Sequence, residues 1–350
     1  DVDAAVEAAV NSFELASNLT LEQKKVILQE IIDGMHSRKE EFAQIISDEM
    51  GAPIKVAKGA QFASGYIHFV NTLKVIDSFK FSEVHDNITI NKLPIGPVGM
   101  ITPWNWPLNQ MCTKVASAIA AGTSFVLKPS EITPGAAQIF AEVVDKTSMP
   151  KGMFNLIHGY GAVVGKAMSA HEGLEMISFT GSTRAGIDIQ KTAAENIKRI
   201  SLELGGKSPN IILDDVDIGE AVSMGMKQCF FNTGQSCSSP TRMLVPENMI
   251  DEATKHAVSS AEAMITGDPM SEDIFLGPIS NKTQFLKVQD LIQKGLDEGA
   301  KLACGGIGRP EGLSKGYFVK PTVFTNVDNS MSIAQEEIFG PVICLIPYKD

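Results

Sequence analysis

The chain has 350 residues, of which 44% are hydrophobic and 20% are charged, and its formal net charge is −11. This length accommodates two domains or one large one with an ample apolar core. The negative charge argues against a nucleic-acid partner, and the sequence has neither basic runs nor an apolar stretch long enough for a bilayer, so we expect no membrane partner either.

The cysteines and histidines point to neither disulfides nor a metal site. Five cysteines are few, odd in number and without a CxxC pair, and the six histidines lack HxxxH or HExxH spacing. We therefore expect no metal and a reducing, cytoplasmic location. No signal peptide is visible, but the sequence begins without Met and stops after a strand-like run, so we expect the natural chain to continue at both ends.

Helical periodicity dominates the N-terminal region. A first helix is expected over residues 1–13. Thr20 and Gln23 make a capping box that opens one long helix, which Gly51 ends because glycine readily adopts the left-handed conformation found after a helix. A further helix is expected over roughly residues 54–79 by the same periodicity.

A strand-and-turn pattern follows in residues 81–97. The alternating run 88–93 stands next to Asp86 and Asn87, which are typical turn residues. Such a strand pair is either an arm that joins another subunit or an ordinary edge hairpin. The residues alone leave both interpretations open.

From residue 98 onward, strands alternate with helices, which predicts parallel α/β sheets whose ligands bind at the carboxyl ends of the strands. The fold class expected is α/β, with two parallel-sheet domains that join near Gly205 and Gly206. The first series has expected strands at 98–102, 124–127, 154–158, 176–180 and 209–213, and the second has strands at 241–245, 319–324 and 342–347 with helices from Asp217, at 249–264 and at 284–298.

Cys237 lies in the small, polar middle of the stretch Phe230–Val245, between an expected helix and an expected strand. Pro240 stops any helix from continuing through this loop. A thiol on a tight loop of this kind is where a nucleophile can meet a small substrate. On this window alone, a buried core cysteine is the alternative.

Three glycine-bearing turns, 159–165, 181–186 and 205–208, follow strands, but none is a complete dinucleotide-binding motif. The second leads into an expected helix whose N-terminus offers backbone donors to a phosphate, and Ser182 could add a hydroxyl donor.

Lys128 and Glu131 follow another strand, and Pro129 restrains the backbone between them. An acidic residue at such a strand end can accept hydrogen bonds from ribose hydroxyls and repel a 2′-phosphate. A solvated surface pair is the alternative.

Two further polar residues stand in unusual surroundings. Asn105 lies between Trp104 and Trp106 and is either an oxyanion donor or a turn former. Glu203 lies inside an apolar strand, where we expect burial to raise the pKa of its carboxyl toward that of a general base.

In combination, these segments closely resemble the aldehyde dehydrogenase superfamily. ITPWNWP, LKPSE, SFTGSTRAG, LELGGKSPN, FFNTGQSC and EEIFGPV look like its signature segments, in the family's order and approximate spacing, and the resemblance covers essentially the whole chain. It implies a Rossmann-like NAD-binding domain (1–75 and 95–206), a protruding hairpin arm (76–94) and a catalytic domain (207–350) that is incomplete at its C-terminus.

The resemblance also implies roles for single residues. Cys237 matches the nucleophile, Glu203 the base that activates the hydrolytic water, Asn105 the oxyanion donor, and Lys114 a lysine that supports the proton path. The cofactor contacts it implies are Ile101, Thr102, Pro103, Trp104, Lys128, Ser130, Glu131, Gly161, Gly165, Phe179, Gly181, Ser182, Leu204, Gly205, Glu337 and Phe339.

The implied activity is oxidation of an aldehyde to a carboxylic acid, with NAD or possibly NADP, through a hemithioacetal and a thioester on Cys237. The implied assembly is a homodimer or homotetramer. One alternative is a semialdehyde dehydrogenase that passes the acyl group to coenzyme A, a class that lacks the base matching Glu203. The other is a non-catalytic binding or structural protein that retains the fold.

Overall fold

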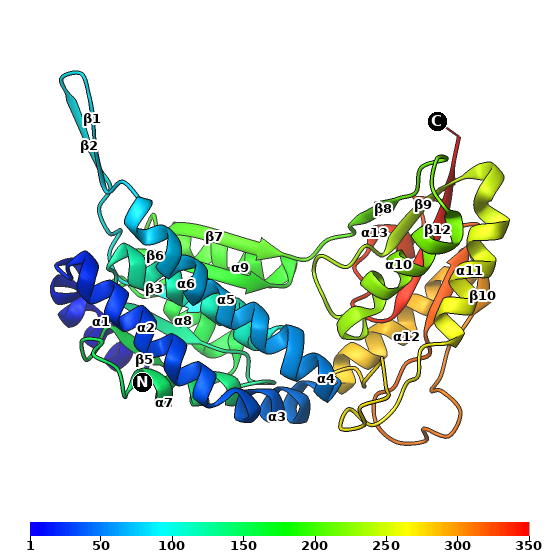
Figure 1. The fold of residues 1–350 in the computed structure, drawn as a ribbon, viewed down its shortest axis with the longest axis horizontal. Coiled ribbons are helices and arrows are strands. Elements are labelled where there is room, and N and C mark those ends of the chain that lie inside the picture. The colour runs from blue at the N-terminus through cyan, green and yellow to red at the C-terminus, as the bar shows by residue number, and fades with distance from the viewer. Residues whose placement is uncertain (350) are drawn as a thin grey trace. The chain divides into compact units, whose positions relative to one another are not determined.

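A computed structural model describes residues 1–349 and separates the chain into two compact units (Figure 1). The first unit comprises residues 1–46 and 57–204, and the second comprises residues 47–56 and those from 205 onward. Within residues 1–349, no helix combines the length and the apolar character needed to cross a membrane.

The N-terminal region is helical, with α1 (Val2–Ser17), α2 (Leu21–Ser37) and α3 (Lys39–Met50). The predicted capping box is confirmed: Thr20 Oγ1 accepts from the Gln23 N–H at 3.2 Å, and Gln23 Oε1 accepts from the Thr20 N–H at 2.9 Å. The prediction of one long helix is wrong, because the chain breaks at Arg38. Arg38 instead directs its guanidinium to Glu41 and Glu142, contacts that helical periodicity does not reveal.

The next segment is α4 (Ile54–Val56), a π-helical turn (Ala57–Gln61), α5 (Phe62–Val75) and a short 3-10 turn (Ile76–Ser78). The predicted hairpin then follows as β1 (Ser82–His85) and β2 (Ile88–Asn91), which pair antiparallel. Asp86 takes a left-handed φ of 52° in the turn. Apolar side chains on the hairpin, including Val84 and Ile88, are exposed.

The first unit is built on a five-stranded sheet in the order β5-β4-β3-β6-β7, and every pairing in it is parallel. Its strands are β3 (Val98–Ile101), β4 (Phe125–Lys128), β5 (Phe154–Leu156), β6 (Met176–Gly181) and β7 (Arg199–Leu204), and the connecting helices are α6 (Pro107–Ala121), α7 (Gly135–Val144), α8 (Lys166–Ala170) and α9 (Thr183–Ala194). The predicted parallel α/β arrangement is confirmed.

The strand that closes the first series in the sequence, β8 (Pro209–Ile211), pairs with β9 (Arg242–Pro246) in the second sheet, beyond the join predicted near Gly205 and Gly206. The edge strands of the first sheet are therefore β5 and β7. A local apolar pattern on both sides of Gly205 and Gly206 shows that strands are present, but it carries no information about which sheet each one joins.

The second unit has a sheet in the order β10-β11-β12-β9-β8. Its pairings are parallel except for the edge strand β10 (Lys301–Cys304), which runs antiparallel to its neighbour and was not predicted. The other elements are β11 (Thr322–Thr325), β12 (Val342–Tyr348), α10 (Ile218–Phe230), α11 (Ile250–Glu262), α12 (Lys282–Asp297) and α13 (Ser332–Gln335).

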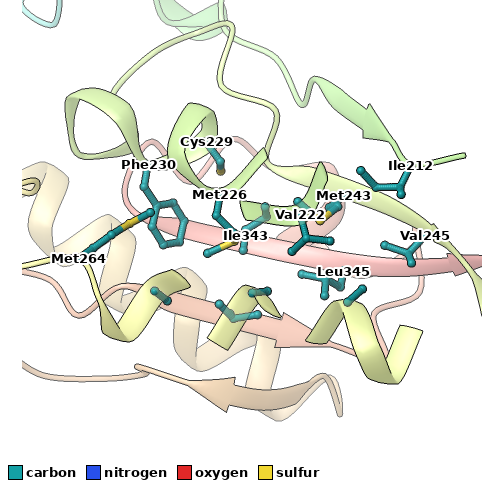
Figure 2. Close-up of a cluster of buried hydrophobic side chains, with 14 of the residues drawn as sticks. Ile212, Val222, Met226, Cys229, Phe230, Met243, Val245, Met264, Ile343 and Leu345 are labelled. Carbon is teal, nitrogen blue, oxygen red and sulfur yellow. The ribbon is translucent and has the colours of Figure 1, made fainter. Parts of the chain in front are cut away.

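The core of the second unit explains why β12 reads as a continuous apolar run. Ile343 and Leu345 belong to a buried cluster with Met226 and Phe230 of α10 (Figure 2). Cys344, between them, belongs to a second buried cluster. Because successive strand residues point to opposite faces, β12 is buried on both sides.

Candidate active site

The loop that carries Cys237 has an unusual backbone. After α10 ends, Asn232 and Thr233 take φ values of 56° and 58° inside a 3-10 turn. Gly234 has a φ of 69°, and a Cβ on it would overlap the carbonyl of Gly340. Left-handed non-glycine residues cost roughly 1–3 kcal/mol each and persist where the surroundings hold them, most often at functional sites.

Side-chain hydrogen bonds hold this backbone in place. Thr233 Oγ1 accepts from the Gly277 N–H at 3.1 Å, and Gln235 Oε1 accepts from the Ser280 N–H at 3.0 Å. Both side chains are fully buried. The loop that precedes Cys237 is therefore fixed by buried contacts rather than left open to solvent.

Exposure separates Cys237 from most of the other cysteines. Cys112, Cys229 and Cys344 are buried, whereas Cys237 and Cys304 are partly exposed. Burial raises the pKa of the Cys304 thiol to about 11, so little thiolate forms there near neutral pH. Cys237 is therefore the partly exposed thiol that stands in a preorganised loop.

Asn105 occupies the loop between β3 and α6, which Pro107 begins at its first helical position. The Asn105 side chain is only 4% exposed, and its backbone carbonyl accepts from Gln61 Nε2 at 3.0 Å. A buried side-chain contact thus fixes the loop backbone.

Glu203 is exposed, so the expectation that its apolar strand buries it is wrong. Among residues 1–349, its strand β7 pairs with β6 alone, and Glu203 stands in register with Thr180 of β6. Apolar neighbours in the sequence do not bury a side chain on an edge strand that is open to solvent.

Lys114 lies near Glu203 on the same cavity. It is 9% exposed, and its Nζ donates to Ser178 Oγ at 2.9 Å. Burial lowers the pKa of Lys114 to about 8, and the negative charge of Glu203 opposes that lowering. The cavity has a volume of about 520 Å³, and its wall includes Lys114, Ser178, Ser201 and Glu203.

The predicted ribose contacts form an ion pair. Lys128 Nζ lies 3.0 Å from Glu131 Oε2, and the Lys128 side chain is almost fully buried. Partial burial raises the pKa of the Glu131 carboxyl, but backbone hydrogen bonds and Lys128 together outweigh it and leave the pKa below its usual value. Ser130 is buried, and its Oγ accepts from the Ile132 N–H at 3.2 Å. The lysine of the pair is therefore buried, while Glu131 is exposed.

Four predicted cofactor residues, Ile101, Gly161, Gly165 and Phe179, line one groove of about 570 Å³ in the first unit. A volume of roughly 300–1,000 Å³ is typical of small-molecule sites. Sequence reasoning missed the face of α9 that completes this groove, namely Arg184, Ala185, Asp188, Ile189, Lys191 and Thr192. Their spacing of three to four residues from Arg184 and Ala185 onward was the available signal.

Ser182 begins α9 as its N-cap, and its Oγ accepts from the Ala185 N–H at 3.3 Å. The hydroxyl proton of Ser182 is thereby left to donate to another group, and the first N–H groups of α9 point out of its N-terminus. A groove, a helix N-terminus and an acidic residue just after β4 together suit a dinucleotide.

Three further predicted cofactor residues, Thr102, Pro103 and Trp104, form the loop that follows β3.

Glu337 packs directly against the glycine pair in the second unit. Its Oε1 accepts from the Gly206 N–H at 3.3 Å, and a Cβ on Gly205 would overlap its carboxylate. Burial raises the pKa of the Glu337 carboxyl. Phe339 takes a left-handed φ of 61°, and its carbonyl accepts from Gln284 Nε2 at 3.1 Å. Both residues are thus held by specific contacts.

The predicted site residues fall into two groups. The first unit holds Asn105, Glu203 and Lys114 together with the cofactor residues from Ile101 to Leu204, and the second holds Cys237, Gly205, Glu337 and Phe339. Within residues 1–349, no cluster of three or more His, Cys, Asp or Glu side chains has the arrangement of a metal site.

The family model, the similar sequences and the similar structures all point to the same family. The family model described as "Aldehyde dehydrogenase family" matches residues 1–350. The chain is 46% identical to 3-succinoylsemialdehyde-pyridine dehydrogenase of a Pseudomonas species over 350 residues, which are 100% of this chain and 73% of that protein.

Two solved structures illustrate the structural match. A mutant of aldehyde dehydrogenase C from Pseudomonas syringae, in complex with NAD+ and octanal, is 47% identical with a TM-score of 0.99, covering 100% of this chain and 72% of that one. Betaine aldehyde dehydrogenase from Staphylococcus aureus, in complex with NAD+, is 36% identical with a TM-score of 0.96, covering 100% and 71%.

Proposed function

This chain belongs to the aldehyde dehydrogenase family, and we propose that it oxidises an aldehyde to a carboxylic acid with NAD, using Cys237 as nucleophile and Glu203 as the base for hydrolysis. The observation that carries this proposal is the family match over all 350 residues. The matched residues include Cys237, a partly exposed cysteine in a strained loop that buried side chains hold in place.

The groove of the first unit supports nucleotide binding. The Lys128–Glu131 pair would hold the ribose hydroxyls, and the N-terminus of α9 with Ser182 would hold the pyrophosphate. Glu337 and Phe339 would contact the nicotinamide side. A bound nicotinamide supplies the hydride acceptor for the oxidation. Glu131 favours NAD over NADP, because its negative charge repels a 2′-phosphate.

Cys237 would act first by adding its thiolate to the aldehyde carbonyl. The tetrahedral adduct carries an oxyanion, and the Asn105 side chain with the Cys237 backbone N–H would donate hydrogen bonds to it. Preorganised donors of this kind contribute because they need no reorganisation as the charge develops. Loss of hydride from the adduct leaves a thioester on Cys237.

Glu203 would then take a proton from the water that attacks this thioester, which releases the acid and restores the thiol. Its exposed position on β7 supports the role, because a base that activates water must be reachable by water. Transfer of the acyl group to coenzyme A is the competing outcome.

We assign the parts of the chain accordingly. Residues 1–75 and 95–206 would bind the nucleotide, residues 207–350 would carry the nucleophile, and the exposed apolar hairpin of residues 76–94 would join a second copy in a homodimer or homotetramer. A cytoplasmic location accords with five cysteines that form no disulfide.

Purified enzyme tests this proposal directly. With a panel of aliphatic and aromatic aldehydes, we expect reduced cofactor to appear with NAD, more slowly with NADP, and the carboxylic acid to accumulate without coenzyme A. Formation of product only when coenzyme A is present would contradict the hydrolytic role of Glu203. An absence of reduced cofactor with every aldehyde would contradict the oxidation itself.

A further inference from the structure

Arg242 stands on a rigid part of the second unit. It is the first residue of β9, the strand that leaves the Cys237 loop, and it is in register with Pro209 of β8 on one side and Cys344 of β12 on the other. The residue is partly buried. Because strands on both sides hold its backbone, Arg242 offers a fixed base from which its guanidinium directs hydrogen bonds.

The guanidinium of Arg242 holds two separate segments of the chain. Its Nε and Nη2 donate to the carbonyl of Lys207 at 2.9 Å and 2.6 Å, and its Nη1 donates to Asn329 Oδ1 at 2.9 Å. Hydrogen bonds from a charged donor are roughly twice as strong as neutral ones. The planar fork of an arginine also keeps its acceptors in a fixed relation to one another, which the single ammonium of a lysine does not.

The segment of Gly205, Gly206 and Lys207 has little means of fixing its own backbone. Glycine has the widest backbone freedom of any residue, and two glycines stand in succession here. The Lys207 amine is buried, and it has no hydrogen-bond partner among residues 1–349. The carbonyl of Lys207 is therefore the point at which a side chain, that of Arg242, anchors this segment.

Both segments that Arg242 holds lead directly to Glu337. On one side, the Gly206 N–H donates to Glu337 Oε1 at 3.3 Å. On the other side, the Asn329 carbonyl accepts from Gln335 Nε2, and Gln335 ends α13 shortly before Glu337. Arg242 thus fixes the chain on both sides of this carboxylate.

The state of the Glu337 carboxyl depends on the same contacts. Burial raises its pKa, and the Gly206 N–H, with the positive charges of Lys287 and Lys207, opposes that rise. An ionised carboxylate accepts hydrogen bonds at both of its oxygens, which is the state that suits contact with a hydrogen-bonding cofactor. Correct placement of Gly206 therefore serves both the position and the charge of Glu337.

We propose that Arg242 is a positioning residue for the nicotinamide side of the cofactor: its guanidinium fixes the backbone that follows the glycine pair, and that backbone holds the Glu337 carboxylate in place. Arg242 itself touches neither the cofactor nor the aldehyde in this account. The inference rests on the proposed contact of Glu337 with the cofactor. It adds a residue of the nucleophile's own strand to the part of the chain that prepares cofactor binding.

The chain offers a matched control. Arg309 also lies in the second unit, and its Nε donates to a backbone carbonyl, that of Gly316, at 2.7 Å. Its contacts lie within the loop 309–316 and do not include the glycine pair. Arg309→Met therefore removes an arginine–carbonyl contact of the same kind from the same unit, as Arg242→Met does, but away from Glu337.

Binding of NADH tests the proposal without any need for catalysis, because the reduced nicotinamide is fluorescent. For Arg242→Met we expect the Kd for NADH to rise about five- to tenfold. Arg242→Lys keeps the charge at this position, and we expect a rise of about threefold, since one ammonium does not replace three donors on two acceptors. Arg309→Met should keep the wild-type Kd. In steady-state kinetics the KM for the aldehyde should stay unchanged in Arg242→Met while the KM for NAD rises.

A double-variant comparison separates a positioning role from a general loss of structure. If Arg242 acts through Glu337, its removal should matter little once the carboxylate is gone. We therefore expect Arg242→Met to weaken NADH binding less than about twofold in the Glu337→Ala background, although it weakens binding five- to tenfold in the wild type. Independent effects would multiply instead.

Three results would overturn the inference. These are a wild-type Kd in both Arg242 variants, an equal rise of the Kd in Arg309→Met, or effects of Arg242→Met and Glu337→Ala that multiply. Failure of the proposed oxidation has a different signature, because a wild-type protein that binds NADH but oxidises no aldehyde leaves all of these measurements in place. A wild-type protein that does not bind NADH would contradict the cofactor contact of Glu337 and this inference with it.

Discussion

Glu337 lies so close to Gly205 that a Cβ on Gly205 would overlap the Glu337 carboxylate, which would have to move aside. The same carboxylate accepts from the N–H of Gly206, whose own Cβ position is empty space. Gly205 thus leaves space for the Glu337 carboxylate, and the N–H of Gly206 donates a hydrogen bond to it. If Glu337 contacts the nicotinamide side of the cofactor, this glycine pair sets its position.

Gly205→Ala should therefore displace Glu337 and weaken NAD binding. We expect the KM for NAD to rise about tenfold, equivalent to roughly 1.4 kcal/mol. Steady-state kinetics measure this change. Gly206→Ala is the control, because nothing lies within 4 Å of its Cβ position. Equal effects of the two substitutions would contradict the account.

Glu131→Gln should shift cofactor preference toward NADP. The substitution keeps the side-chain shape, removes the charge that repels a 2′-phosphate, and leaves Lys128 beside the site as a cation. We expect the ratio of kcat/KM for NADP over NAD to rise about tenfold or more. An unchanged ratio would remove Glu131 from ribose recognition.

The two partly exposed cysteines, Cys237 and Cys304, should differ in their rate of alkylation. We expect iodoacetamide near neutral pH to inactivate the enzyme in step with modification of Cys237, while Cys304 stays largely unmodified because burial raises its pKa to about 11. Peptide mass spectrometry follows both sites. Cys304→Ala should keep wild-type activity, and Cys237→Ala should lose it by a factor on the order of 10⁴ or more. Loss that tracks Cys304 would contradict the assignment.

The sequence predicted most of the elements correctly because their signals are local. The capping box at Thr20 and the alternation of strands and helices each depend on neighbouring residues. Long-range features were missed for the same reason. Arg38, where the helix breaks, pairs with Glu142, which lies far along the chain, and the antiparallel β10 depends on its partner strand β11.

The same contrast between local and long-range signals applies to the candidate site. Motifs identified residues that gather in one groove, such as Gly161 and Phe179. They did not show that Glu203 lies on an exposed edge strand, because exposure depends on which strands pair. Nor did they reveal the contact between Lys114 and Ser178, which joins a helix to a strand 64 residues away.

Gly234 should tolerate no side chain. Its φ of 69° is left-handed, and a Cβ there would overlap the backbone carbonyl of Gly340, which cannot move aside as a flexible side chain would. We expect Gly234→Ala to lower the free energy of unfolding of the second unit by more than about 3 kcal/mol, since left-handed strain and a backbone clash add. Urea denaturation measures this.

Gly308→Ala is the matched control for strain without a clash. Gly308 also has a positive φ, of 88°, but nothing lies within 4 Å of its Cβ position. Strain alone should cost only about 1–2 kcal/mol. Comparable losses in the two variants would show that the contact with Gly340 contributes nothing.

The central claim is that Cys237 carries an acyl group that Glu203 releases by activating water. Mass spectrometry of the Glu203→Gln enzyme, quenched during turnover with NAD and an aldehyde, tests it most directly. We predict one acyl group on the peptide that contains Cys237, a full burst of reduced cofactor and a steady rate lowered 10²-fold or more. An undiminished steady rate, or an enzyme that gives a burst without any acyl group on Cys237, would contradict the claim.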